Sequence, residues 1–248
     1  MPRPAVSGVV VPLQAADGVA KRPSSGSVAA IEPRSRSELA NRVMNVAIAS
    51  LALVLLSPVI ALFALLVKLT SRGPIFYRQV RVGIDKRWMR DEQPNNRRWR
   101  DLGGQAFIIY KFRSMYTNAE HGSGAVWATK GDSRVTPVGR VMRACRVDEI
   151  PQLVNVILGD MNIVGPRPER PTIFARLCED IEEYPYRQRA KPGITGWAQI
   201  NQRYDTCLDD VRSKVRFDLE YLQRHGVAQD LLIMARTLPV MIFRKGAH

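Results

Sequence analysis

A continuous apolar segment, Val46 to Val67, places the strongest constraint on how this chain folds. As an α-helix it would extend for about 33 Å, enough to cross the hydrocarbon core of a bilayer. Ser57 and Pro58 stand at its centre. Proline has no N–H for the carbonyl four residues earlier, its ring crowds that carbonyl, and it disfavours helical angles at the preceding residue. The segment therefore predicts two half-helices of about eleven residues with a break at Ser57 and Pro58.

Basic residues flank the apolar segment on both sides: Arg34, Arg36 and Arg42 precede it, and Lys68, Arg72, Arg78 and Arg81 follow it. Such residues normally stay on the cytoplasmic side of a membrane. A hairpin that enters one leaflet and returns satisfies both flanks, whereas a straight span satisfies only one. A re-entrant helix–break–helix over residues 38–70 and a kinked transmembrane helix are the two structures that these residues allow.

The composition predicts a folded domain beyond this membrane element. The chain has 248 residues, of which 46% are hydrophobic, and a formal net charge of +14. Next to a membrane element, anionic lipid and a phosphate-bearing substrate explain this charge more simply than nucleic acid does. Isolated cysteines and histidines argue against structural disulfides, zinc chemistry and Cys–His catalysis; they are Cys145, Cys178, Cys207, His121, His225 and His248.

The rest of the chain divides into a tail and a domain. Residues 1–37 are rich in Pro, Ser, Ala and Gly and predict a disordered tail. Residues 71–248 form the predicted catalytic domain, which contains a basic loop with two tryptophans at 85–104. That loop fits either a solvated segment at a lipid surface or a nucleic-acid contact. We predict a strand over Phe107–Phe112 and helices over 149–158, 171–183, 207–224 and 230–243.

These elements predict an α/β fold class, mostly α with a small β element. The last helix, 230–243, is amphipathic, and its apolar face suits either a lipid surface or a protein core. The resulting architecture is an N-terminal membrane hairpin attached to a compact domain with interfacial helices.

The adjacent acids Asp148 and Glu149 are the centre of chemical interest. Asp148 is predicted to cap a helix that tolerates Pro151 in its first turn, and both acids would complement the helix dipole. The same place serves chemistry, because Asp148 near Arg143 and Arg146 would stay ionised, as a carboxylate nucleophile must. Glu149 lies about 100° further round a helix, so one acid could attack while the other holds a metal ion. Capping and catalysis both fit the pair.

Three basic residues are candidates for phosphate binding. Lys111 and Arg113 are two apart on a predicted strand, so they would share one face about 6.6 Å apart, a spacing that suits a diphosphate. They equally fit ordinary surface charges on an edge strand. Arg167 lies between Pro166 and Pro168, whose fixed φ angles would preorganise it for a bidentate phosphate contact.

Together these motifs resemble the bacterial sugar transferases, which are monotopic phosphoglycosyl transferases acting on polyprenyl phosphate. The resemblance covers the chain from about residue 42 onward and rests on several long motifs in the same order. The matching stretches are Leu56–Pro58, Gly73–Gln79, Tyr110–Met115, Asp148–Leu153, Gly159–Met161, Val164–Pro168 and Lys191–Gln199.

The resemblance implies roles for individual residues. The break at Ser57 and Pro58 would make a re-entrant hairpin, with the active site on the cytoplasmic face of the bacterial inner membrane. Asp148 matches the nucleophile and Glu149 the partner acid, and the two are the expected metal ligands. The expected phosphate-binding residues are Lys111, Arg113, Arg143 and Arg167.

The resemblance also implies the reaction. Asp148 would attack the β-phosphate of a UDP-sugar, release UMP and pass the sugar-1-phosphate to undecaprenyl phosphate, with Mg²⁺ as cofactor. The product would begin an exopolysaccharide, capsule or O-antigen repeat unit. The implied partners are the donor, the lipid acceptor and anionic membrane lipids, with no nucleic acid; a homodimer is compatible with this arrangement.

Three departures from the family pattern stand out: the insertion at 85–104, Arg146–Val147 in place of Ser-Leu, and Asn201–Arg203 in place of Asn-Gly-Arg. Two other classes compete with the enzyme. A membrane-tethered nucleic-acid binder would use the basic insertion but leaves the acid pair unexplained. A non-catalytic partner of a polysaccharide assembly complex would not need the acid pair. A phosphatase using the Asp would normally carry an Asp-x-Asp pattern, which the acid pair lacks.

Overall fold

The computed structural model describes residues 32–86, 103–117, 119, 132–202 and 207–242. Most of the predicted tail and of the predicted basic insertion lies outside these ranges. The helices are α1 (Glu38–Leu55), α2 (Ser57–Thr70), α3 (Pro137–Ala144), α4 (Gln152–Leu158), α5 (Pro171–Asp180), α6 (Trp197–Asn201), α7 (Leu208–Arg224) and α8 (Val227–Ile242). The strands are β1 (Phe76–Val82), β2 (Ala106–Phe112), β3 (Asn162–Val164) and β4 (Gly193–Thr195), and the short 3₁₀ helices are η2 (Val147–Glu149) and η3 (Tyr184–Arg189).

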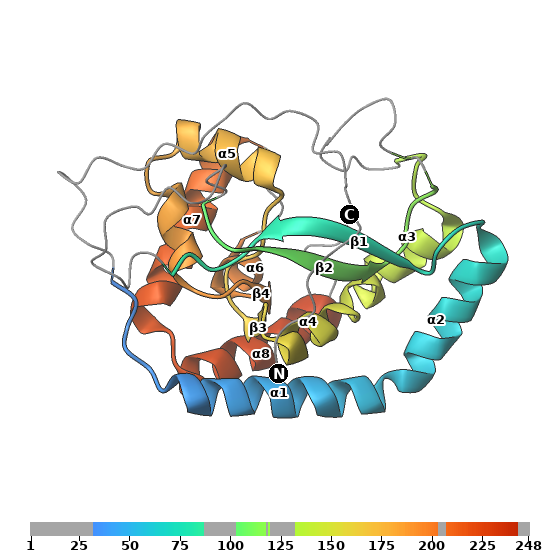
Figure 1. Cartoon of the computed structure of the whole chain (residues 1–248), viewed down its shortest axis with the longest axis horizontal. Coiled ribbons are helices and arrows are strands. Elements are labelled where there is room, and N and C mark those ends of the chain that lie inside the picture. Colours follow the sequence, from blue (N-terminus) through green and yellow to red (C-terminus); the bar gives the residue numbers. More distant parts are fainter. Residues whose placement is uncertain (1–31, 87–102, 118, 120–131, 203–206, 243–248) are drawn as a thin grey trace.

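The apolar segment forms two helices that meet at a bend, as predicted (Figure 1). The break lies at Leu56, one residue earlier than predicted, and Ser57 is the first residue of α2. Pro58 needs no N–H partner in the first turn of a helix, so the helix restarts there. The Ser57 hydroxyl donates to the Val54 carbonyl at 2.8 Å, so this carbonyl keeps a hydrogen bond. With 18 residues, α1 is longer than the predicted half-helix, because it begins well before the apolar segment.

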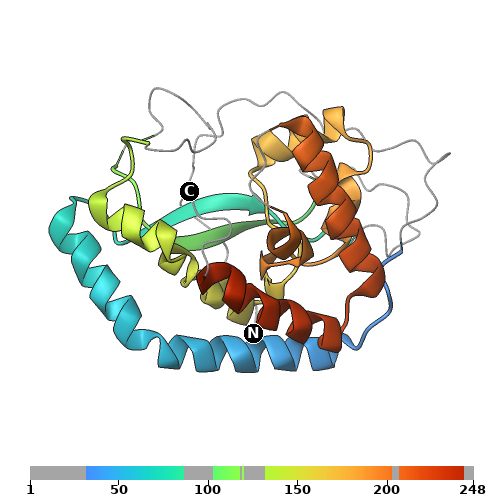
Figure 2. The same ribbon diagram turned by 180° about the vertical axis from the view of Figure 1, so that it is seen from behind.

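Both ends of this bent pair are held by the same folded body. In α1, Arg42 donates to two carbonyls of α4, and the Asn45 side chain accepts from the N–H of Ile163 at 2.6 Å. At the far end of α2, Val67 packs in a buried cluster with Phe112. Helix α1 also runs beside α8, as Figures 1 and 2 show. One face of the pair therefore packs against the domain, from Ala49 of α1 to Val67 of α2.

Apolar side chains of the pair remain exposed around the bend. Within the described residues, α1 is the one helix both long and apolar enough to cross a membrane, and α2 is a shorter apolar helix. The exposed side chains of this surface, which we call the apolar bend, are Leu51, Val54, Leu55, Leu62, Leu65 and Leu69.

The β element consists of two small sheets. Strands β1 and β2 pair antiparallel, with Phe76 opposite Phe112, which confirms the predicted strand. Strands β3 and β4 pair in parallel, with Asn162 opposite Gly193. The described part of the chain is thus mostly helical with small sheets, as predicted.

The predicted helices differ from the observed ones by up to three residues at their ends. Helix α7 agrees with 207–224 to within one residue, and α5 ends three residues before the predicted end. Helix α4 begins at Gln152 and not at Glu149, since Pro151 cannot donate a helical hydrogen bond. Its end is as predicted, with Gly159 in the left-handed conformation at φ 89°.

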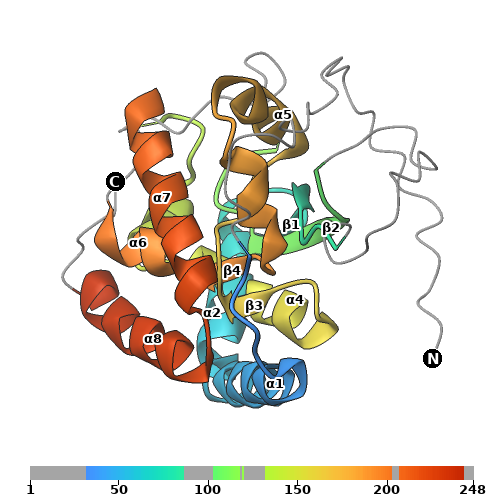
Figure 3. The same cartoon turned by 90° about the vertical axis from the view of Figure 1, so that its left-hand side faces the viewer.

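Helix α8 combines both faces that its sequence allowed. Ile233 is fully buried in the core with Leu222 of α7 and Met161, whereas Leu231 and Leu232 are exposed. Figure 3 shows α8 and α1 side by side at the base of the molecule, with α7 above α8 and α4 above α1. One side of α8 therefore belongs to the core, and the other carries exposed apolar side chains.

Candidate active site

The acid pair lies on a 3₁₀ turn between two helices. After α3, Arg146 adopts the left-handed conformation with φ 55°, and Val147–Glu149 form η2. The prediction that Asp148 caps α4 is therefore wrong, because Pro151 delays the start of that helix. A 3₁₀ helix has about three residues per turn, so neighbouring side chains still diverge, by about 120°. The two acids thus face different surroundings.

Glu149 is buried and surrounded by cations. Its Oε1 accepts from Arg167 Nη2 at 2.6 Å and from Lys111 Nζ at 3.1 Å. Arg146 Nη1 lies 3.6 Å from Oε2. Burial by itself would raise the pKa of Glu149, but the charges of Arg167 and Lys111 outweigh it and hold the pKa well below its usual range. Glu149 is therefore held in its ionised form and gathers three basic side chains.

Asp148 has the opposite electrostatic balance. Burial, followed by repulsion from Glu149, raises the pKa of Asp148 to about 6, although Lys111, Arg167 and Arg143 act to lower it. No hydrogen bond from a described residue reaches its carboxylate. Near neutral pH, Asp148 is thus a mostly ionised carboxylate with little stabilisation of its charge. Weak stabilisation of this kind favours nucleophilic attack.

The position of Lys111 depends on a side chain that the sequence did not single out. Asn155 of α4 donates to the Ile108 carbonyl at 2.6 Å and accepts from the Tyr110 N–H at 3.0 Å, which fixes β2 against α4. Lys111 is the next residue of that strand, and burial lowers its pKa despite the opposing effect of Glu149. The available signal in the sequence was a polar residue, Asn155, inside an otherwise apolar helical segment.

Arg113 does not join the cluster around the acids. It follows the end of β2 and donates to the carbonyls of Arg72 at 2.9 Å and Ser71 at 2.8 Å. Its guanidinium therefore holds the segment that follows α2 and, unlike Lys111, does not contact Glu149. Strand spacing no longer applies beyond Phe112, where β2 ends. Arg143, by contrast, is close enough for its charge to lower the pKa of Asp148.

The loop that carries Arg167 is fixed by a hydrogen bond from a buried ion pair. Arg187 Nη2 donates to the Arg167 carbonyl at 3.0 Å and lies 2.7 Å from Asp218 Oδ2. Both members of the pair are fully buried, at 0% and 1% exposure. Neither residue was predicted, since each looks like an ordinary charge in a polar segment.

The acids differ in how well they would serve Mg²⁺. Among the described residues, no group of three or more His, Cys, Asp or Glu side chains is arranged to hold a metal ion. Mg²⁺ is commonly bound by one or two carboxylates together with substrate phosphates. Asp148 fits that role, because its carboxylate is not engaged in hydrogen bonds with described residues. Glu149 fits it less well, because basic side chains already contact both of its oxygens.

Comparison with known proteins identifies the family. Residues 36–244 match the family described as "Bacterial sugar transferase". The chain belongs to this family. Membership confirms the resemblance seen in the sequence motifs.

Individual relatives extend the comparison. The chain is 39% identical, over 84% of its length, to a UDP-N-acetylgalactosamine-undecaprenyl-phosphate N-acetylgalactosaminephosphotransferase of Aeromonas hydrophila, and covers 44% of that protein. It is 37% identical, over 87% of its length, to a UDP-glucose:undecaprenyl-phosphate glucose-1-phosphate transferase of Caulobacter vibrioides, and covers 74% of it. It is 33% identical, over 85% of its length, to the exopolysaccharide production protein ExoY of Sinorhizobium fredii, and covers 88% of it. The chain thus spans less than half of the first relative and most of the other two.

Proposed function

We propose that this protein transfers a sugar-1-phosphate from a UDP-sugar to undecaprenyl phosphate and so begins the assembly of a polysaccharide repeat unit. Two of the relatives above are named for this transfer, and a third for exopolysaccharide production. The observation that carries the proposal is the acid pair. Asp148 is a weakly stabilised carboxylate beside a cluster of cations, and Glu149 holds those cations in place.

The first half of the proposed reaction forms a covalent intermediate on Asp148. Its carboxylate oxygen attacks the β-phosphorus of the donor, and the bond from that phosphorus to the bridging oxygen breaks. UMP leaves with the electron pair, and the sugar-phosphate remains attached to the carboxylate. Lys111, Arg143 and Arg167 offset the negative charge that gathers on the phosphate oxygens. Mg²⁺, when bound with the donor beside Asp148, adds to this charge stabilisation.

In the second half, a phosphate oxygen of undecaprenyl phosphate attacks the same phosphorus. The bond to Asp148 breaks, the carboxylate is regenerated, and the product is a sugar linked to the lipid through a diphosphate. Glu149 remains ionised throughout and keeps Lys111 and Arg167 in position, which is a role in organising the site.

The proposed location of the protein follows from the bent helical pair. Residues 38–70 would form a re-entrant membrane element and residues 71–248 the catalytic domain on the cytoplasmic face of the inner membrane. Both ends of the pair are anchored to one body, through Asn45 and Val67, while the apolar bend between them is exposed. A segment that spanned the bilayer would need its two ends on opposite sides. Burial of the apolar bend in one leaflet instead brings the acid pair near the phosphate of the lipid acceptor.

The test is UMP release from UDP-sugars by the full chain in lipid nanodiscs with Mg²⁺ and undecaprenyl phosphate. We expect release with at least one donor to depend on the lipid acceptor and to be lost in Asp148→Asn. The matched control is Asp209→Asn, the same substitution at an exposed position, measured in the same assay. Full turnover by Asp148→Asn would refute the nucleophile. Release of free sugar-1-phosphate without lipid product would indicate hydrolysis, and no release with any donor would favour the non-catalytic partner.

A further inference from the structure

One buried polar group near the acid pair has no partner. Both the amide nitrogen and the amide oxygen of Gln199 in α6 are buried, and neither makes a hydrogen bond with the part of the chain that the structure describes. A buried amide without hydrogen bonds destabilises a protein, because it loses its contacts with water and gains none in return. An unpaired amide of this kind is accounted for when a ligand supplies the missing partners.

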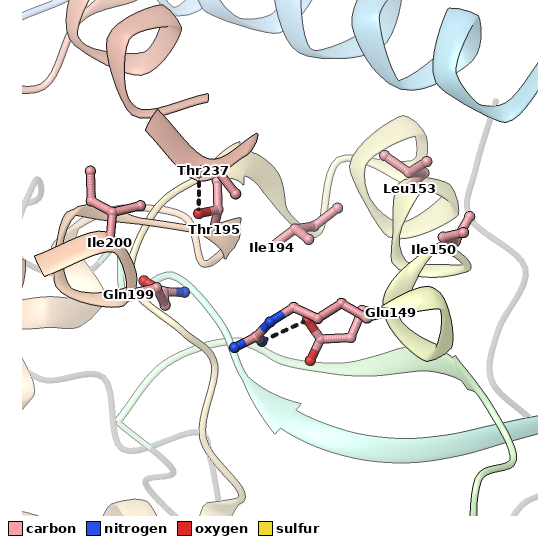
Figure 4. Close-up of a pocket in the computed structure, with 9 residues that line it drawn as sticks. Glu149, Ile150, Leu153, Ile194, Thr195, Gln199, Ile200 and Thr237 are labelled. Atoms are coloured by element: carbon pink, nitrogen blue, oxygen red, sulfur yellow. Dashed lines mark hydrogen bonds and ion pairs between the residues drawn. The ribbon is translucent and has the colours of Figure 1, made fainter. Parts of the chain in front are cut away.

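The Gln199 amide borders a cavity of about 160 Å³ next to Glu149. Figure 4 shows Gln199 and Ile200 on one side of this cavity and Ile150 and Leu153 on the other. Most of the lining is apolar, with Ile194 completing that surface.

The two threonine hydroxyls that line the cavity already have hydrogen-bond partners. Thr195 and Thr237 are hydrogen-bonded to each other at 2.8 Å, and Thr237 also donates to the Ile233 carbonyl. Arg146 and Glu149 form their ion pair at the edge. Gln199 is therefore the lining side chain whose polar atoms are available to a ligand.

A flat ring with one polar edge matches this cavity. Apolar walls of about this volume accommodate a six-membered ring, as the binding of benzene in an engineered cavity of about 150 Å³ shows. The Gln199 amide offers one donor and one acceptor side by side. The imide edge of uracil offers the complement, with the N3–H as donor and a neighbouring carbonyl oxygen as acceptor.

We propose that this cavity binds the uracil base of the donor nucleotide and that Gln199 pairs with its imide edge. The inference rests on the proposed function, because a UDP-sugar brings the base. The neighbouring Glu149 marks the site of phosphate chemistry, so the base would occupy the cavity while the diphosphate extends toward Asp148.

Other parts of the two substrates match the cavity less well. A hexose carries hydroxyls around its ring, and the isoleucine and leucine side chains would leave them without partners. An isoprenoid chain would fit the apolar walls but would leave the Gln199 amide unpaired. Uracil matches both the apolar walls and the Gln199 amide, because its faces are apolar and its imide edge can form hydrogen bonds.

The variant Gln199→Met separates a binding role from a structural one. Methionine has nearly the same length and shape but no hydrogen-bonding amide. Because the native amide is unpaired, its removal is expected to leave the melting temperature unchanged or to raise it. Gln223→Met, on the exposed surface of α7, is the matched control. If methionine lowers the melting temperature, Gln199→Leu repeats the test with a stiffer apolar side chain.

The decisive experiment compares UMP with N3-methyl-UMP, whose imide donor is blocked, by calorimetry on the full chain in nanodiscs. We expect the wild type and Gln223→Met to bind UMP about tenfold more tightly than N3-methyl-UMP, which is the effect of one to two neutral hydrogen bonds. In Gln199→Met the two ligands should bind equally. CMP cannot replace the methylated ligand, because the glutamine amide can turn over and pair with cytosine.

The outcomes distinguish this inference from the function on which it rests. If N3-methylation weakens binding equally in wild type and Gln199→Met, the imide edge is recognised elsewhere and the inference is wrong. The same conclusion follows if the protein transfers sugar-phosphate but does not discriminate the two nucleotides. If no UDP-sugar is turned over and UMP does not bind, the proposed function fails, and the uracil site fails with it.

Discussion

The pKa of Asp148 gives the most direct test of how the acid pair works. Its ordinary value is 3.8, and burial together with Glu149 raises it to about 6. This rise corresponds to about 3 kcal/mol by which the site disfavours the ionised carboxylate. If the ionised form is the nucleophile, kcat/KM must rise with pH through about 6. A carboxyl with this pKa is about tenfold more ionised at pH 7 than at pH 5, so the rate should change by the same factor.

Glu149→Gln should move this acidic limb to lower pH. The substitution removes the negative charge next to Asp148 and releases Lys111 and Arg167 to stabilise the remaining carboxylate. The midpoint of the acidic limb should then lie between pH 3.8, the ordinary pKa of an aspartate, and about 6, the pKa of Asp148 beside Glu149. Lys111→Met should move it the other way, because it removes a charge that lowers the pKa of Asp148. Glu179→Gln, at an exposed site on α5, should leave the limb unchanged.

The assay is UMP release under kcat/KM conditions from pH 4.5 to 8, with each variant compared with its own plateau. Low absolute activity therefore does not prevent the comparison. Titration of ¹³C-labelled aspartate, with Asp148→Asn to assign the signal, measures the same pKa without turnover. An acidic limb that stays in place in Glu149→Gln, or that moves to higher pH, would refute the electrostatic coupling inferred from the structure.

Three further predictions concern stability and topology. Asp218→Asn should lower the free energy of unfolding by about 3 kcal/mol or more, because it leaves the Arg187 guanidinium buried without its counter-charge; an unchanged denaturation midpoint would contradict this. Asn155→Leu should raise KM for the donor and destabilise the fold by about 1–3 kcal/mol, since two backbone groups of β2 lose their partners; normal KM and stability would show that β2 is held otherwise. In a background without the native cysteines, Ser35→Cys and Lys68→Cys should react with an impermeant maleimide from the same side of a vesicle, whereas labelling from opposite sides would indicate a span.

Local sequence patterns predicted much of the secondary structure. The proline at position 58 predicted a break to within two residues, because the missing N–H acts locally. Apolar and aromatic content identified the strand that became β2, and Gly159 marked the end of α4. The predicted start of α4 was wrong because the prediction placed Pro151 inside the helix, whereas Pro151 precedes the first helical residue, Gln152.

The candidate site was predictable in its acids but only partly in its cations. Lys111 and Arg167 reach Glu149, although they are far apart in the sequence. Arg113 was grouped with Lys111 on strand spacing, but β2 ends before it and its guanidinium donates to the carbonyls of Ser71 and Arg72 after α2. A spacing rule holds only while the element continues, and the sequence does not show where it stops.

The sequence by itself determined the broken apolar segment, the adjacent acids, the proline-flanked arginine and the family to which the chain belongs. These are properties of local backbone chemistry and of motif order. The tertiary structure alone decided how the charges are distributed. It brought basic side chains from β2, the loop after β3 and the turn before η2 onto Glu149, and it left Asp148 with a raised pKa. It also left the Gln199 amide unpaired beside a cavity. Burial and long-range contacts set the energy of each ionised or polar group, and neither can be read from residues that are neighbours only in the chain.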